Sequence, residues 1–110
     1  SSNNSVIIGS QAGYDVESNN QVFIGYRAGY EVSSGTDNVL LGMQAGDAIT
    51  TGSNNIVIGK DAAASSATVS NEITLGNSSA STLRCNTQTI SSLSDAPAQD
   101  LQAEEWRVTK

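Results

Sequence analysis

Residues 54–62 read Asn54-Asn55-Ile56-Val57-Ile58-Gly59-Lys60-Asp61-Ala62, and their pattern recurs along most of the chain. An apolar triplet precedes a glycine five times, at the nearly evenly spaced positions Gly9, Gly25, Gly42, Gly59 and Gly76. An Asn or Asp stands five residues before each glycine, and an Ala stands three residues after the first four. Spacing kept at this many positions is the signature of a repeat architecture.

Each repeat predicts one coil of a solenoid. The triplets are rich in β-branched and aliphatic residues, which favour strands, whereas the preceding Asn or Asp suits a turn. Stacked coils would pair their strands at about 4.8 Å, and aligned Asn side chains would hydrogen-bond along the stack. Residues 1–80 hold all 10 glycines and lack a helical apolar period. We therefore expect an all-β fold, a parallel β-solenoid or β-roll of about five 17-residue coils over residues 1–80.

Alternation along a strand assigns two faces to each triplet. The first and third residues are predicted to fill the coil interior with the alanines: Val6, Ile8, Val22, Ile24, Val39, Leu41, Ile56, Ile58, Ile73 and Leu75. The middle residues are then predicted to point outward as an apolar stripe that forms a trimer interface: Ile7, Phe23, Leu40 and Val57. The alternative is a wider single-chain solenoid that encloses both faces.

The composition and charge of the chain exclude several classes of function. The chain has no histidine, a single cysteine (Cys85) and a net charge of -6, from 5 basic and 11 acidic residues. We expect no enzyme activity, metal site or cofactor, because the commonest general base and metal ligand is missing. We expect neither nucleic acid nor membrane insertion, since the charge is acidic and no apolar run reaches the roughly 18 residues of a membrane span.

Three tyrosines fall in the first two repeats, at Tyr14, Tyr26 and Tyr30. Stacked coils would bring them near one another, where aromatic faces could contact a glycan. The alternative role is packing against the neighbouring coil or chain.

The units Asn4-Ser5-Val6-Ile7-Ile8-Gly9 and 54–59 resemble the head repeats of trimeric autotransporter adhesins, and similar repeats occur in phage tail fibres. The resemblance covers residues 4–80. It implies a left-handed parallel β-roll with three chains packed around one axis. The period of 17 and the Ala-Gly-Tyr segments depart from the adhesin pattern and imply a wider roll or longer corners.

Residues 81–95 are similar to the stretch that precedes the endosialidase-type intramolecular chaperone of phage tail fibres and tailspikes. That resemblance implies that residues 81–95 form a β extension and that Ser94-Asp95 corresponds to the self-cleavage junction of that family. The Lys that the family carries shortly afterwards is absent, which favours a plain polar corner over a cleavage junction at this pair. Residues 96–110 lose the glycines, and we expect a short helix or an irregular tail there.

These patterns favour a structural segment of a homotrimeric phage tail fibre or tailspike, located in the virion. It would serve as a rigid shaft, with other tail proteins and a host glycan or other receptor as further partners. The alternative is the head domain of a trimeric adhesin on a bacterial surface.

Overall fold

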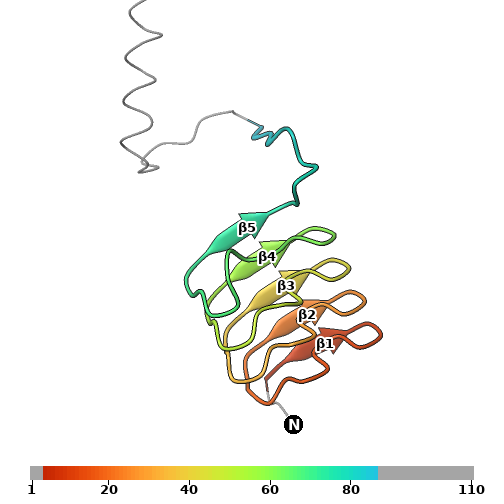
Figure 1. Ribbon diagram of the computed structural model, residues 1–110. Helices are drawn as coiled ribbons and strands as arrows, with labels where there is room; N and C mark the ends of the chain where they lie inside the picture. The colour runs from red at the N-terminus through yellow and green to blue at the C-terminus, as the bar shows by residue number, and fades with distance from the viewer. Residues whose placement is uncertain (1–3, 87–110) are drawn as a thin grey trace, which may run out of the picture.

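The computed structural model of the chain describes residues 4–86 and confirms the predicted parallel β-solenoid. Its strands form one sheet in chain order: β1 (Val6–Ile8), β2 (Val22–Ile24), β3 (Val39–Leu41), β4 (Ile56–Ile58) and β5 (Ile73–Leu75). Figure 1 shows the coils stacked with their loops aligned beside the sheet. Pairing is in register, since Val22 lies opposite Val6 on one side and Val39 on the other. Residues 4–86 contain no helix, and so none that could cross a membrane.

The corners on either side of each strand depend on left-handed backbone. The Asn or Asp two residues before each strand has a positive φ, for example 63° at Asn20 and 60° at Asp37. Short polar side chains tolerate this region better than other residues, which explains their recurrence there. After β2 the chain turns at Gly25, whose φ is 134° and where a Cβ would lie 2.5 Å from the carbonyl oxygen of Gly42. Glycine is therefore required at position 25, because a larger residue would fit neither the positive φ nor the space beside Gly42.

The core is a narrow column inside the coils. Phe23, Leu40 and Val57, the middle residues of their strands, are fully buried. Across the coil they face small and medium side chains, which are also buried: Ala28, Ala45, Ala62, Val32 and Ile49. The column has little spare volume, because a Cβ at Gly29 would lie only 2.7 Å from Cε2 of Phe23. Each coil therefore has room for one large side chain from its strand.

This column corrects the facing predicted from the sequence. The middle residues Phe23, Leu40 and Val57, predicted as a trimer interface, are sealed inside a single chain, and Ile7 at the first coil is half-buried. The first and third residues of the triplets, predicted as coil interior, lie on the outer face and are exposed or half-buried: Val6, Ile8, Val22, Ile24, Val39, Leu41, Ile56, Ile58, Ile73 and Leu75. The physical reason is volume, since two aliphatic rows per strand would not fit in the narrow coil.

A buried side-chain ladder fixes which way the strands face. The residues just before β2, β3 and β4, namely Gln21, Asn38 and Asn55, are fully buried polar side chains. The backbone N–H of Asn38 donates to Oε1 of Gln21 at 3.1 Å, and the N–H of Asn55 donates to Oδ1 of Asn38 at 3.1 Å. The amide ladder expected from the sequence thus lies one residue later than predicted. At the predicted row, Asn54 donates to Asn71 at 2.7 Å on the surface.

The chain leaves the solenoid after β5. Residues 81–86 form no strand, and Cys85 is half-buried with a free thiol. The rest of the predicted β extension, the pair Ser94-Asp95 and the predicted tail at 96–110 lie outside the described residues.

Candidate functional site

The loops that follow the strands line one edge of the solenoid. We call this edge the corner loops, and it comprises residues 10–14, 26–30, 43–47, 60–64 and 77–80, which follow the five strands. Backbone hydrogen bonds hold successive loops in register, such as Arg27 N–H to the Ser10 carbonyl at 2.9 Å and Gln44 N–H to the Tyr26 carbonyl at 2.7 Å. Equivalent side chains in adjacent loops therefore lie one strand spacing, about 4.8 Å, apart.

The first two corner loops hold an aromatic stack. The rings of Tyr14 and Tyr30 have centroids 4.9 Å apart and planes 8° from parallel. The guanidinium carbon of Arg27 lies 3.8 Å from the centre of the Tyr30 ring, within the range of a cation–π interaction. Arg27 Nη1 also donates to Oε1 of Gln11, one coil earlier, over a long 3.4 Å. The result is a preformed surface of two rings and one cation.

The structure thus brings together two of the three tyrosines predicted as a glycan contact. Tyr26 lies at the start of its corner loop and is 45% exposed, and the described ring contacts join only Tyr14 with Tyr30. The sequence reasoning missed Arg27. Its signal was available, because Arg27 occupies the same repeat position as Gln11 and stands three residues before Tyr30. Whether these side chains contact a glycan stays a prediction.

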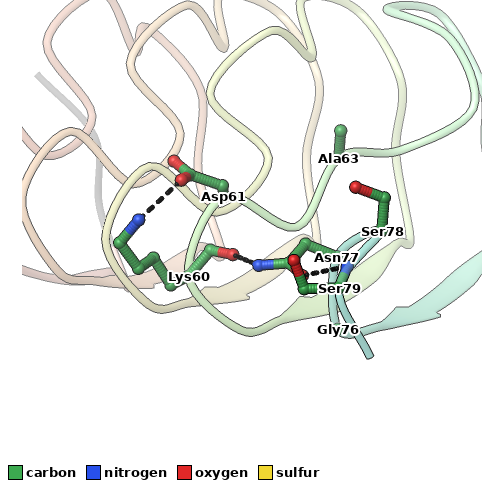
Figure 2. A pocket seen from close by; sticks show the side chains of 7 residues that line it. All are labelled: Lys60, Asp61, Ala63, Gly76, Asn77, Ser78 and Ser79. Carbon is green, nitrogen blue, oxygen red and sulfur yellow. Dashed lines mark hydrogen bonds and ion pairs between the residues drawn. The ribbon is translucent and has the colours of Figure 1, made fainter. Parts of the chain in front are cut away.

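The last two corner loops border an open hollow of about 500 Å³, lined by Lys60, Asp61, Ala63, Gly76, Asn77, Ser78 and Ser79 (Figure 2). It forms where the repeat degenerates. Position 63 is Ala instead of the glycine found at 29 and 46, and it lacks the positive φ of those residues. Asn77 joins the two loops, because its Nδ2 donates to the Lys60 carbonyl at 2.7 Å while its Oδ1 accepts the Ser79 N–H at 2.7 Å.

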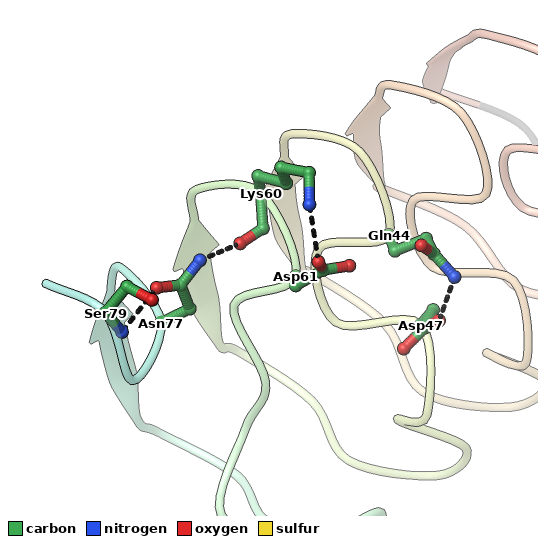
Figure 3. A network of polar contacts seen from close by, with 6 residues as sticks. All are labelled: Gln44, Asp47, Lys60, Asp61, Asn77 and Ser79. Atoms are coloured by element: carbon green, nitrogen blue, oxygen red, sulfur yellow. Dashed lines mark hydrogen bonds and ion pairs between the residues drawn. The ribbon is translucent and has the colours of Figure 1, made fainter.

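The charges around this hollow are already partnered (Figure 3). Lys60 Nζ lies 2.9 Å from Asp61 Oδ2, and both side chains are largely exposed. Gln44 Nε2 contacts Asp47 Oδ2 at 3.5 Å in the loop before. An exposed ion pair of this kind contributes little stability, about 0–1 kcal/mol. Among residues 4–86, no three His, Cys, Asp or Glu side chains are grouped so that they could hold a metal ion.

One carboxyl group has a displaced pKa. The backbone N–H of Ser65 donates to Oε1 of Glu72 at 2.9 Å and lowers the pKa of that carboxyl below its ordinary value. The hydrogen bond stabilises the charged form. It joins Glu72, which occupies the ladder position just before β5 and whose own N–H donates to Oδ1 of Asn55 at 3.0 Å, to the long loop after β4. Its role is to close that loop.

The outer face of the sheet is an extended apolar surface. Two parallel rows of five aliphatic side chains run along it, the first and third residues of each strand, and no charged residue interrupts them. Seven of the ten are exposed: Val6, Ile8, Ile24, Ile56, Ile58, Ile73 and Leu75. We call these two rows the outer face. Exposed apolar surfaces of this extent are typical of interaction sites.

Comparison of the chain with protein-family models, curated proteins and solved structures finds no match. Function is therefore argued from two features of the chain itself. One is the outer face, which is uniform along the solenoid. The other is the row of corner loops, which changes from aromatic and cationic at one end to polar at the other.

Proposed function

We propose that this chain is a structural segment of a homotrimeric phage tail fibre or tailspike, in which it provides a stiff shaft. The observation that carries the proposal is the outer face, with ten aliphatic side chains in two rows that no part of the described chain covers. The resemblance of the repeats to trimeric adhesin heads and tail fibres supports an assembly of three chains. The likeness of residues 81–95 to the segment before a tail-fibre chaperone favours the virion over a bacterial adhesin head.

The energetics are consistent with self-association. Full burial of a Val, Leu or Ile side chain stabilises by about 1.5–3 kcal/mol. Seven side chains that are each roughly half exposed would therefore contribute on the order of 5–10 kcal/mol per chain. This is comparable with the roughly 4–15 kcal/mol that association costs in lost translational and rotational freedom. The outer face thus supplies a driving force of the right size.

The shaft's stiffness follows from the bonding within each chain. Backbone hydrogen bonds join neighbouring coils in the strands and in both sets of corners, for example Val22 N–H to the Asn38 carbonyl at 2.9 Å and Gly13 N–H to the Ala28 carbonyl at 2.9 Å. Bending the stack requires several of these bonds to stretch together. The corner loops remain on the outside of such a rod, where they would contact a receptor.

The test is the native mass of the 110-residue chain, measured by mass spectrometry or sedimentation equilibrium over a range of concentrations. One chain has a mass of 11.3 kDa, and the expected result is three times that value. A mass of 11.3 kDa at every concentration would contradict the proposal.

A further inference from the structure

We infer that Tyr14, Tyr30 and Arg27 form a binding site for a carboxylate-bearing sugar within an otherwise neutral glycan. This inference names a ligand class for the receptor contact of the proposed function, and it rests on that function for its biological context. The site itself is built within one chain and does not need the trimer. It combines an aromatic pair with a cation, and an acidic sugar is the ligand that fits both.

The aromatic pair offers a rigid and accessible ring. Tyr14 is 63% exposed although it stacks on Tyr30 at 4.9 Å. The backbone beneath the pair is fixed by two bonds between the coils, Asp15 N–H to the Tyr30 carbonyl at 3.2 Å and Gly13 N–H to the Ala28 carbonyl at 2.9 Å. A ring held in place in the free protein loses little conformational entropy when a ligand binds. The C–H face of a pyranose matches such a ring in shape and polarity.

Arg27 is a cation without a carboxylate partner. The ion pair found in the described residues joins Lys60 and Asp61, and Arg27 has no acidic group of residues 4–86 within salt-bridge distance. Its bond to Gln11 is long, at 3.4 Å, and its buried Nε has no hydrogen-bond partner. A guanidinium carries five N–H donors, so most of its capacity remains unused. A carboxylate, which can accept two parallel hydrogen bonds from the fork of an arginine, is the acceptor that this group lacks.

Charge decides between a sugar and a nucleic acid, both of which combine a stacking surface with anionic groups. Binding single-stranded nucleic acid requires a basic groove that follows several phosphates. The described chain has three basic residues, Arg27, Lys60 and Arg84, and an acidic residue directly follows each stacked tyrosine in the sequence, at Asp15 and Glu31. One isolated cation in acidic surroundings suits one carboxylate, not a chain of phosphates. The ligand class is therefore a uronic or similar acidic sugar flanked by neutral sugars.

The experiment titrates the full chain with methyl glucuronide and, separately, with the neutral methyl glucoside, and follows the tyrosine ring resonances by NMR. We expect saturable shifts at Tyr14 and Tyr30, with the glucuronide binding roughly tenfold more tightly because of the charged hydrogen bonds to Arg27. Arg27→Gln should remove this preference and leave weak binding of both sugars. Tyr14→Ala should weaken both sugars, whereas Tyr26→Ala, which removes an exposed tyrosine outside the stack, should change neither.

Several results would contradict the proposed binding site. Equal binding of the two sugars, an unchanged preference in Arg27→Gln, or a loss in Tyr26→Ala as large as that in Tyr14→Ala would overturn the site. Tighter binding of oligothymidylate than of the glucuronide would replace the sugar with nucleic acid. Absence of any saturable shift in a chain whose native mass is that of a trimer would overturn the site alone. A monomer that binds the glucuronide would overturn the trimer alone.

Discussion

The backbone N–H of Asn55 donates to Oδ1 of Asn38, one coil earlier, at 3.1 Å, and both side chains are fully buried. The Nδ2 of Asn38 in turn donates to the Gly52 carbonyl at 3.0 Å. One amide therefore satisfies a donor just before β4 and an acceptor in the loop that leads into that strand. It joins the coil of β3 to the loop before β4.

Replacing this amide should be costly. Asn38→Leu keeps the number and branching of the side-chain heavy atoms but leaves the Asn55 N–H and the Gly52 carbonyl buried without partners. Each orphaned group costs about 1–3 kcal/mol, so we expect a loss of roughly 2–6 kcal/mol in the free energy of unfolding. Urea unfolding at fixed protein concentration measures it. The control is Asn54→Gly, which keeps the left-handed backbone and removes only the exposed bond to Asn71; a loss there as large as in Asn38→Leu would refute the role of the buried ladder.

A methyl group at the corner after β2 should break the stacking of coils. In Gly25→Ala the new Cβ would lie 2.5 Å from the Gly42 carbonyl oxygen, at a φ of 134°. We expect a loss of about 3 kcal/mol or more in unfolding free energy, seen as a lowered midpoint of thermal unfolding.

The milder comparison is Gly76→Ala at the last corner. There the new Cβ would approach only the side chain of Ala80, at 3.0 Å. We expect a smaller loss, because the segment after β5 can move aside. Equal midpoints for the two variants would show that the close approach of Gly25 and Gly42 does not limit the fold.

The Ser65–Glu72 bond predicts a local response to acid. The pKa of Glu72 is lowered in the folded chain, so this carboxylate stabilises the fold at pH values above its unfolded pKa. That contribution is lost as the pH falls through the lowered pKa. The protection of the Ser65 amide against hydrogen exchange, measured relative to its intrinsic exchange rate at each pH, should therefore fall in this acidic range, and in Glu72→Gln this pH dependence should flatten. Protection of Ser65 that does not change with pH in the natural chain would contradict the assignment.

The sequence predicted the repeat, the strands and the parallel stack correctly because these depend on spacing. Glycine and Asn positions set the corners, and in-register pairing follows from the constant period. The strand that contains Phe23 illustrates this, since its bounds coincide with the apolar triplet at 22–24.

The direction in which each triplet faces was predicted wrongly. Nearly all positions of the triplets are apolar, so alternation along the strand is compatible with either set of residues facing inward. The volume of the coil interior decides which set does. The available signal was the residue before the triplet. Gln21, Asn38 and Asn55 lie just before their strands, and their side-chain oxygens accept hydrogen bonds from the backbone of the next coil while buried inside the solenoid. The inversion moves the proposed interface from the middle row to the outer face.

The candidate site was partly accessible from the sequence. The stacking of Tyr14 on Tyr30 follows from their common repeat position. The placement of Arg27 over Tyr30 depends on the corner geometry, where Arg27 has a left-handed φ of 58°, unusual for this residue type. Sequence spacing alone does not predict that conformation at an arginine.

The most direct test of the proposed interface compares charge substitutions at two adjacent residues of β4. Val57 is sealed in the coil, so Val57→Asp should unfold the chain, since it buries an unpaired carboxylate. Ile58 belongs to the outer face, so Ile58→Asp should keep the far-ultraviolet circular dichroism of the natural chain while its native mass falls from that of a trimer to the 11.3 kDa of one chain. An Ile58→Asp chain that stays trimeric, or a Val57→Asp chain that remains folded as a monomer, would contradict this account.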